Sequence, residues 1–297
     1  MSAQQVAAGH YRRQVSIARR AAVRIAKLWR QVDRASIAAS WTRQLVEAFT
    51  VVSGAQAVAA AGAGVYVEDV LEAQGLAGDP AGRVNPARFA EVASDGRDLT
   101  TLLYQPAIRV LAAIGAGASP AQAMKAGAVD LDMIVRTQIA DAGRAADGVA
   151  ITARPQVTGY VRMLSLPSCS RCIILAGRNY GWNKGFLRHP RCDCRHIPAV
   201  EDTADELRTD PKKAFEAMDA AEQDRVFGMA GAQAVRDGAD LAKVGNARRG
   251  VYVAAGRKYT TEAAGRRPRL MPEQIYQEAN GDRLEAIRLL KLHGFLI

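Results

Sequence analysis

The four cysteines of this chain constrain its folding more than any other feature. They fall within 26 positions, as a Cys-x-x-Cys turn at Cys169 and Cys172 and, after nineteen intervening residues, a Cys-x-Cys pair at Cys192 and Cys194. Two such clusters bind one tetrahedral zinc ion when the loop between them brings them together, and a closed site of this kind contributes directly to folding. The spacing therefore predicts a structural zinc in the second half of the chain.

More side chains are available than one zinc ion can bind. The candidate ligands are Cys169, Cys172, Cys192, Cys194 and His189, with His196 as the last choice. The first pair is expected in every arrangement, and the other two positions stay open among the remaining candidates. A catalytic zinc needs a position open to water and a base beside it. Protein can fill all four positions here, and the only nearby carboxylate is Asp193, so the sequence favours a structural ion.

Three other uses of the cysteines fit the sequence less well. Disulfide pairs suit a secreted protein, but residues 1–30 are basic and periodic, without the apolar stretch and cleavage site of a signal peptide. A thioredoxin-like redox motif gives the second cysteine pair no role. A zinc deaminase needs a His-x-Glu motif upstream, and the only upstream histidine is His10, which lies in a predicted helix.

Positive charge is concentrated in three segments. Residues 12–34 carry eight Arg or Lys against one acid, residues 161–200 carry seven against one, and residues 243–269 carry eight against one. These segments together hold +20, so the net charge of +10 leaves the rest of the chain at −10. Charge concentrated in this way indicates a nucleic acid or an acidic protein surface as a partner. The alternative is three solvated faces that only keep the protein in solution.

The first 150 residues have the periodicity of α-helices. Apolar side chains recur three and four positions apart in residues 11–32, which predicts one buried stripe. The stripe consists of Tyr11, Val15, Ala18, Ala22, Ile25, Trp29 and Val32. Further helices are predicted over residues 37–52, 98–114 and 133–150. Pro106 is expected to break the second of these, and Ser119-Pro120 is a helix start with Ser119 as the N-cap.

Residues 48–67 carry no charge, which raises the possibility of a membrane-spanning helix. Most of these residues are Ala, Gly, Ser, Thr or Gln. Small side chains bury little apolar area, so they insert poorly into a membrane. The composition therefore favours a tightly packed internal pair of helices.

The residues from Ile151 onward favour β-strands, with the segment from Tyr160 to Leu164 leading toward the Cys-x-x-Cys turn. We therefore predict an α+β protein that is predominantly α-helical, with a small β-containing zinc-bound module in its second half. The expected domains are a helical region at residues 1–150, the zinc module at residues 151–200 and a helical region at residues 201–297.

The C-terminal region has the pattern of helices joined by glycine turns. One helix is predicted from Pro211, one over residues 222–237 with Gly238 as its stop, and one from Pro272. Residues 245–269 combine four glycines with Arg and Lys, which predicts a flexible basic loop that becomes ordered on an anionic partner. Its expected nucleic-acid contacts are Arg248, Arg249, Arg257, Lys258, Arg266 and Arg267.

The cysteine motif and its surroundings resemble a known family, the phage Mu F-like minor head proteins. The shared features are a helical N-terminal half, a helix with Arg136-Thr137-Gln138, the Cys-x-x-Cys turn, a glycine-containing loop and the closing His189-Pro190-Arg191-Cys192-Asp193-Cys194. Asp193 stands where the family commonly has Arg, and Gln138 where it commonly has Glu. The likeness covers about residues 100–297, and its C-terminal part is similar to members from actinobacterial phages.

The resemblance implies a minor capsid protein of head morphogenesis, without enzymatic activity. The implied partners are the phage portal protein, the major capsid or scaffold protein, and DNA bound non-specifically. No membrane and no small-molecule substrate is expected. The implied location is the interior of the phage head near the portal vertex, and the host cytoplasm during assembly.

Two other classes of function stay open. A host-type zinc-containing DNA-binding protein would explain both the charge and the metal, but aromatic residues for base stacking are not interleaved with the arginines. A metal-dependent hydrolase or nuclease needs an open coordination position and a base next to it, and His196 is the only imidazole left over near the cysteines.

Overall fold

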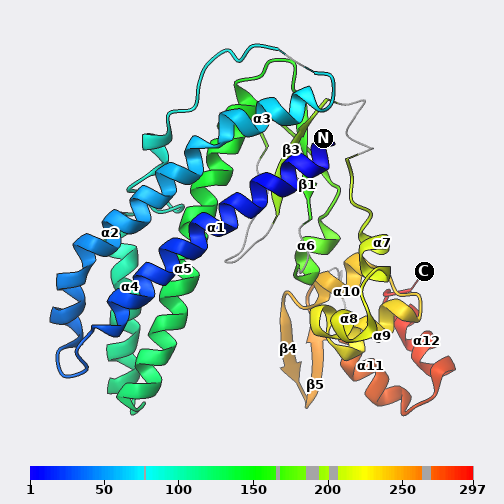
Figure 1. Cartoon of the computed structure of the whole chain (residues 1–297). Helices are drawn as coiled ribbons and strands as arrows, with labels where there is room; N and C mark the ends of the chain where they lie inside the picture. Colours follow the sequence, from blue (N-terminus) through cyan, green and yellow to red (C-terminus); the bar gives the residue numbers. More distant parts are fainter. Residues whose placement is uncertain (77, 165–167, 185–193, 201–206, 263–268, 297) are drawn as a thin grey trace. The chain divides into compact units, whose positions relative to one another are not determined.

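The computed structural model describes residues 1–76, 78–164, 168–184, 194–200, 207–262 and 269–296 (Figure 1). The chain forms two compact units. The first consists of Met1–Arg162 and Asn179–Leu207, and the second of Met163–Arg178 and Arg208–Ile297. Residues 151–200, which we expected to form a module of their own, contribute to both units. The fold is α+β and predominantly helical, as predicted, with two small three-stranded sheets.

The first unit is a bundle built around one long helix. Its helices are α1 (Ala3–Arg30), α2 (Ile37–Ala61), α3 (Ala63–Glu72), α4 (Leu99–Gly115) and α5 (Pro120–Thr152). Helix α5 packs against the other four, and Figure 1 shows α1, α2 and α4 running alongside it. The predicted start at Ser119-Pro120 is confirmed, because the Ser119 hydroxyl caps α5 by accepting from the Gln122 N–H.

Two tryptophans anchor the core of the bundle. Trp29 and Trp41 meet edge to face, with their ring centroids 5.0 Å apart. Both indole N–H groups are satisfied inside the core, since Trp29 donates to the Met124 carbonyl and Trp41 to the Leu103 carbonyl, each at 3.1 Å. Helices α1, α2, α4 and α5 are thereby fixed to one another.

Three predicted helices differ in extent from the structure. Helix α2 continues to Ala61 rather than Val52, and the helix that starts at Pro120 continues through the segment predicted separately over residues 133–150, so that both form α5. The break expected at Pro106 is wrong, because α4 runs through it. A proline inside a helix removes one backbone hydrogen bond. Here Pro106 and its neighbour Ala107 are buried in the core, which offsets that loss.

The stripe predicted for α1 is correct only in its C-terminal part. Ile25 and Trp29 are buried, but Val15 is 39% exposed. His10 and Gln14 are buried instead, at 2% and 3% exposure. An α-helix has 3.6 residues per turn, so residues 10 and 14 lie on the same side as Ala18 and Ala21. Polar side chains occupy this side because partners inside the bundle bind them.

The helical stretch Ile37–Glu72 is long and apolar enough to cross a membrane by length and composition alone. The core helices of soluble proteins also meet this criterion. In the structure this stretch forms α2 and α3, with Trp41, Val52 and Tyr66 completely buried within the bundle. Helices α2 and α3 follow one another at Gly62 and pack mainly against α1 and α5 rather than against each other, so the segment belongs to the bundle but does not form the expected packed pair.

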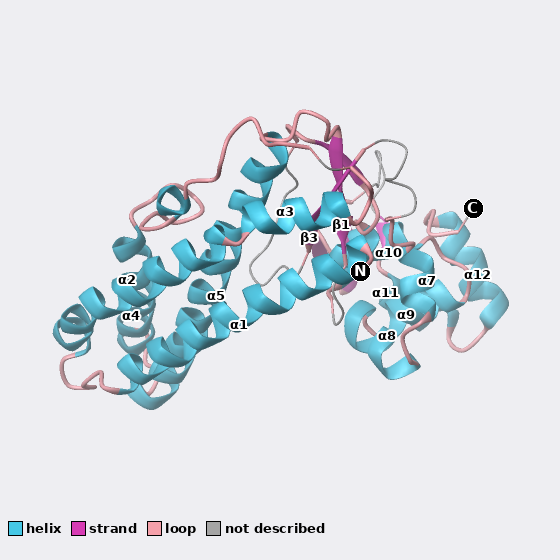
Figure 2. Cartoon of the chain, turned by 45° about the horizontal axis from the view of Figure 1, so that its top comes forward, coloured by secondary structure: helices cyan, strands magenta, loops and turns pink. Residues whose placement is uncertain are grey.

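A small sheet completes the first unit. Its strands are β1 (Gly159–Met163), β2 (Asn179–Gly181) and β3 (Arg195–Ala199), in the order β2-β1-β3. Every residue of β1 and β3 is buried, and β3 packs against α1, α3 and α5. Figure 2 shows β1 and β3 beside α3. Because both faces of these strands are buried, their residues do not alternate between buried and exposed, and Arg162, Arg195 and His196 are buried with the apolar residues.

The second unit consists of short helices and a sheet. The helices are α6 (Ser170–Ile174), α7 (Pro211–Glu216), α8 (Ala220–Phe227), α9 (Met229–Arg236), α10 (Leu241–Ala247), α11 (Pro272–Ala279) and α12 (Arg283–Leu292). The sheet consists of β4 (Val251–Ala254), β5 (Arg257–Thr260) and β6 (Arg269–Leu270), in that order. Aspartates 210, 219, 240 and 282 cap four of the helices.

Positive backbone φ angles explain why this unit differs from its predicted elements. The helix expected over residues 222–237 is two helices, because Gly228 lies between α8 and α9 with φ +74°. The flexible loop expected over residues 245–269 is wrong for its described part. Val251 to Thr260 forms a hairpin whose two turn residues, Ala255 and Gly256, have φ +48° and +74°.

Candidate functional site

The first cysteine pair forms a compact turn in the second unit. Cys169 is the N-cap of α6, and its Sγ accepts a hydrogen bond from the Cys172 N–H at 3.4 Å. Cys169 is exposed, whereas Cys172 is buried beside Ile173 and Ile174 of the apolar core. A metal ion binds the thiolate form of cysteine, and a backbone N–H directed at the sulfur is compatible with that form. The turn therefore has the chemistry expected of one half of a zinc site.

The second cluster is described only from Cys194 onward, and its end is fixed to the bundle. The Cys194 carbonyl accepts from Arg144 Nε at 3.0 Å, and Arg144 also pairs with Asp141 at 2.9 Å. Cys194 is completely buried. His196, the weakest candidate ligand, lies in β3, where its ring packs on Tyr160 with centroids 4.3 Å apart. The imidazole is thus buried within the first unit.

The zinc site stays a prediction. His189 and Cys192 lie outside the described residues, as does Asp193. Cys169 and Cys172 belong to the second unit and Cys194 to the first. Within the part of the chain that the structure describes, no three His, Cys, Asp or Glu side chains form a group that could hold a metal ion.

Four of the predicted nucleic-acid contacts lie at the β4–β5 hairpin, and all four are exposed: Arg248, Arg249, Arg257 and Lys258. The other two, Arg266 and Arg267, lie outside the described residues. Arg249 is 3.6 Å from Glu262, and Arg257 is 3.4 Å from Glu278. Exposed pairs of this kind contribute little to stability, but each acid offsets part of the positive charge that a phosphate would meet.

The sequence analysis missed a buried polar cluster in the first unit. The Nε2 atom of His10 is 3.2 Å from the Asp147 carboxyl group, and the His10 ring stacks on Tyr66 with centroids 4.0 Å apart. Tyr66 donates its hydroxyl proton to the His196 carbonyl. Gln14 donates to the Ala59 carbonyl at 2.9 Å. The cluster therefore joins α1, α2, α3, α5 and β3.

Burial sets the chemistry of this cluster. It raises the pKa of Tyr66 well above its usual range, and the nearby Asp147 acts in the same direction, so the phenol stays neutral and can donate. Gly143 is the one sequence signal for the cluster, because a Cβ there would lie 2.6 Å from Gln14 Oε1. The cluster lies inside the bundle, so we interpret it as a set of contacts that stabilises the fold.

Comparison with known proteins identifies a family. The sequence model of the VG15 protein family matches residues 1–221. The chain belongs to the VG15 protein family. The family name suggests a phage protein, in agreement with the phage part of the resemblance. No curated protein and no solved structure matches the chain.

The residues that match the VG15 family model include more of the N-terminal region than the resemblance to the Mu F-like proteins does. It includes the first hundred residues, and therefore α1, α2 and α3, which the resemblance left out. It also includes both cysteine pairs. The match ends at residue 221, before the hairpin and its cations. The matched residues thus include the bundle and the cysteine motif.

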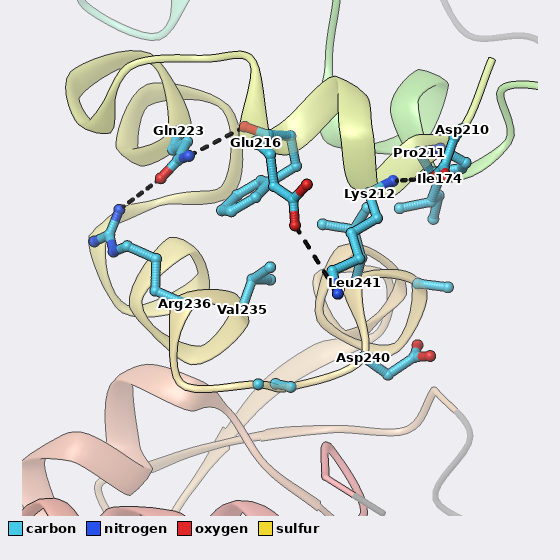
Figure 3. Close-up of a pocket in the computed structure, with 14 residues that line it drawn as sticks. Ile174, Asp210, Pro211, Lys212, Glu216, Gln223, Val235, Arg236, Asp240 and Leu241 are labelled. Carbon is cyan, nitrogen blue, oxygen red and sulfur yellow. Dashed lines mark hydrogen bonds and ion pairs between the residues drawn. The ribbon is translucent and has the colours of Figure 1, made fainter.

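The second unit of this VG15 protein has a cleft of about 780 Å³ at α7 and the helices next to it (Figure 3). Its polar groups already have partners. Gln223 donates to the Phe215 carbonyl and accepts from Arg236, each at 3.0 Å, and Lys212 pairs with Glu216 at 3.9 Å. The lining residues include no histidine, cysteine or hydroxyl side chain. Its ionisable side chains are the carboxylates Asp210, Glu216 and Asp240 and the cations Lys212 and Arg236.

Proposed function

We propose that this VG15 protein is a minor head component of a tailed phage, that it assembles with the portal protein and that it has no catalytic turnover. The observation that carries this proposal is the family match over residues 1–221, which includes the bundle and both cysteine pairs. The Mu F-like spacing of those cysteines supports the finer assignment to head morphogenesis. The proposed location is the head interior near the portal vertex, with the capsid or scaffold protein as a further partner.

The cleft supports a role without catalysis. Its described charged groups cap helices or pair with one another, as Asp210, Asp240 and the Lys212–Glu216 pair do. An enzyme needs groups that change their interactions in the transition state. The caps formed by Asp210 and Asp240 stabilise the fold, which fits a connector or scaffold.

Zinc is part of the proposal as a structural ion. Cys169 and Cys172 would bind it with two further ligands from Cys192, Cys194 and His189. The ion would supply folding free energy, because the unfolded chain has no preformed site. The N–H directed at Cys169 Sγ supports this use of the first pair.

DNA contact is the last part of the proposed function. The exposed side chains Arg248, Arg249, Arg257 and Lys258 at the β4–β5 hairpin would contact phosphates without reading sequence. The duplex itself, packed inside the head, would be the partner.

Co-expression with the portal protein of the same phage tests the proposed function. We expect a complex that survives size-exclusion chromatography, and the protein in purified virions. Deleting the gene should lower infectious titre more than particle number. If virions lack the protein and the portal does not bind it, the head-protein assignment is wrong. A protein that still binds DNA after that result would be a free DNA-binding protein.

A further inference from the structure

We propose that the exposed face of α1 is the principal duplex-binding surface of this protein. Helix α1 runs along the outside of the bundle (Figure 1) and contains no acidic residue. Its seven cations are all exposed: Arg12, Arg13, Arg19, Arg20, Arg24, Lys27 and Arg30. We call this set the α1 cationic face.

The helical repeat places the α1 cationic face on one side. At 3.6 residues per turn, the seven side chains fall within an arc of about 140°, opposite the buried Ala18, Ile25 and Trp29. They extend over about 27 Å along the axis, at about 1.5 Å per residue. A duplex carries one phosphate per about 1.7 Å, so this length offers roughly 16 phosphates to seven cations.

Within the arc, the arginines form two rows. Arg12, Arg19 and Arg30 make one row, and Arg13, Arg20 and Arg24 make the other, about 100° away around the helix. Lys27 and the uncharged side chains of Ser16 and Val23 lie between the rows. The major groove is about 12 Å wide and admits an α-helix. Two flanking rows of cations match the two phosphate backbones that border such a groove.

The α1 cationic face is less neutralised than the hairpin. Among the ion pairs between described residues, one reaches these seven cations, from Arg24 to Glu47 at 3.9 Å with both side chains more than half exposed. At the hairpin, by contrast, Arg249 and Arg257 both have an acid within 4 Å. A phosphate would therefore meet more uncompensated charge on α1.

Helix stability does not explain this arrangement. Cations in the last turn, here Lys27 and Arg30, interact favourably with the helix dipole. Arg12, Arg13, Arg19 and Arg20 lie in earlier turns, beyond the reach of that effect. Like charges four positions apart, such as Arg20 and Arg24, repel each other in the isolated protein. An external polyanion would relieve this repulsion.

The same surface fits a protein partner less well. Protein interfaces use aromatic and apolar anchors in a desolvated centre. Helix α1 exposes two large apolar side chains, Val15 and Val23, and it exposes no aromatic ring. Charge without anchors suits a phosphate backbone, and six of the seven cations are Arg, the better phosphate ligand.

This inference rests on the DNA binding of the proposed function and specifies its surface, but it does not depend on binding to the portal protein. The experiment is therefore run on the purified full-length chain with a labelled random-sequence 30-base-pair duplex, by fluorescence anisotropy from 50 to 200 mM salt. The variant Arg13→Gln/Arg20→Gln/Arg24→Gln removes one row and keeps helix propensity. The charge-matched control Arg43→Gln/Arg83→Gln/Arg88→Gln removes three exposed arginines elsewhere in the first unit.

We expect the α1 variant to bind at least about tenfold more weakly at 100 mM salt. Its log–log salt slope should be shallower by about 2 to 3, because three phosphate contacts are lost. The control should stay within about threefold of the wild type, and circular dichroism should show both variants folded. Equal losses in the two variants, an unchanged α1 variant, or no wild-type binding at 50 mM salt would overturn the inference. So would an α1 variant that keeps DNA but loses the portal, since that result makes this face a protein-docking surface.

Discussion

The imidazole of His10 stacks on the phenol of Tyr66 at 4.0 Å, with the two rings only 6° from parallel. This pair lies inside the bundle, and each ring is bound to a different element, His10 to Asp147 of α5 and Tyr66 to the carbonyl of His196 in β3. The strand that follows the second cysteine cluster is thereby held by the same contacts that hold the N-terminal helix. A substitution of either ring should therefore destabilise both α1 and β3.

The first prediction concerns the His10–Asp147 pair. Replacing either residue by Ala leaves the other polar group buried without this partner, so each single variant should lose about 3 kcal/mol of unfolding free energy. The double variant should lose at least about 1 kcal/mol less than the sum of the two. Urea unfolding followed by tryptophan fluorescence measures this, because Trp29, Trp41 and Trp182 all lie in the first unit. Strictly additive losses would show that the two side chains are not coupled.

The second prediction is a loss of stability in alkali. Burial raises the pKa of Tyr66 above the usual tyrosine value of 10.0, so the unfolded state releases this proton at lower pH than the folded state does. The stabilisation is therefore complete below pH 10 and decreases as the pH rises above it. The Tyr66→Phe variant should show a smaller decrease between pH 9 and 11 in fluorescence-detected unfolding. Tyr276→Phe is the control variant. Burial and Asp237 also raise the pKa of Tyr276, but this residue lies in the second unit, whereas the three tryptophans lie in the first.

The third prediction compares two glycines of α5. A Cβ at Gly127 would lie 2.5 Å from Val110 and 2.7 Å from Trp29, whereas a Cβ at Gly148 meets nothing within 4 Å. Gly127→Ala should lower the unfolding free energy by about 1–3 kcal/mol, because the core has no room for a methyl group. Gly148→Ala should raise it by up to about 1 kcal/mol through helix propensity. Equal effects of the two substitutions would contradict the packing at Trp29.

Local signals in the sequence were sufficient to predict where some helices begin and end. Ser119-Pro120 and Asp210-Pro211 start helices as their capping chemistry predicts, and Gly238 follows the end of α9 with φ +97°. Capping depends on neighbours in the chain, so a sequence pattern can show it.

Elements whose stability depends on distant partners could not be predicted in the same way. His10 looks like a polar residue beside the α1 stripe, and only its partner 137 positions away makes its burial favourable. The β4–β5 hairpin turns at Ala255-Gly256, which lacks the Asn-Gly or Asp-Gly pair that marks such turns. Its Tyr252 and Tyr259 stack across the strands at 5.6 Å, a contact that exists only once the strands pair. The same limit applies to the pairing of Arg249 and Arg257 with acids.

The last prediction tests zinc as a folding element. Protein purified under reducing conditions without chelator should contain about one zinc per chain, and Cys172→Ser should lose it, because a thiolate ligand is removed. Hydrogen exchange in β1 and β3 should then become faster, while the fluorescence of Trp29 and Trp41 in the bundle core stays unchanged. Ser170→Ala, in the same turn but without a thiol, should keep both the metal and the protection. Less than about 0.2 zinc per wild-type chain would show that the cysteines do not form a structural zinc site, since such sites bind the ion tightly enough to keep it through purification.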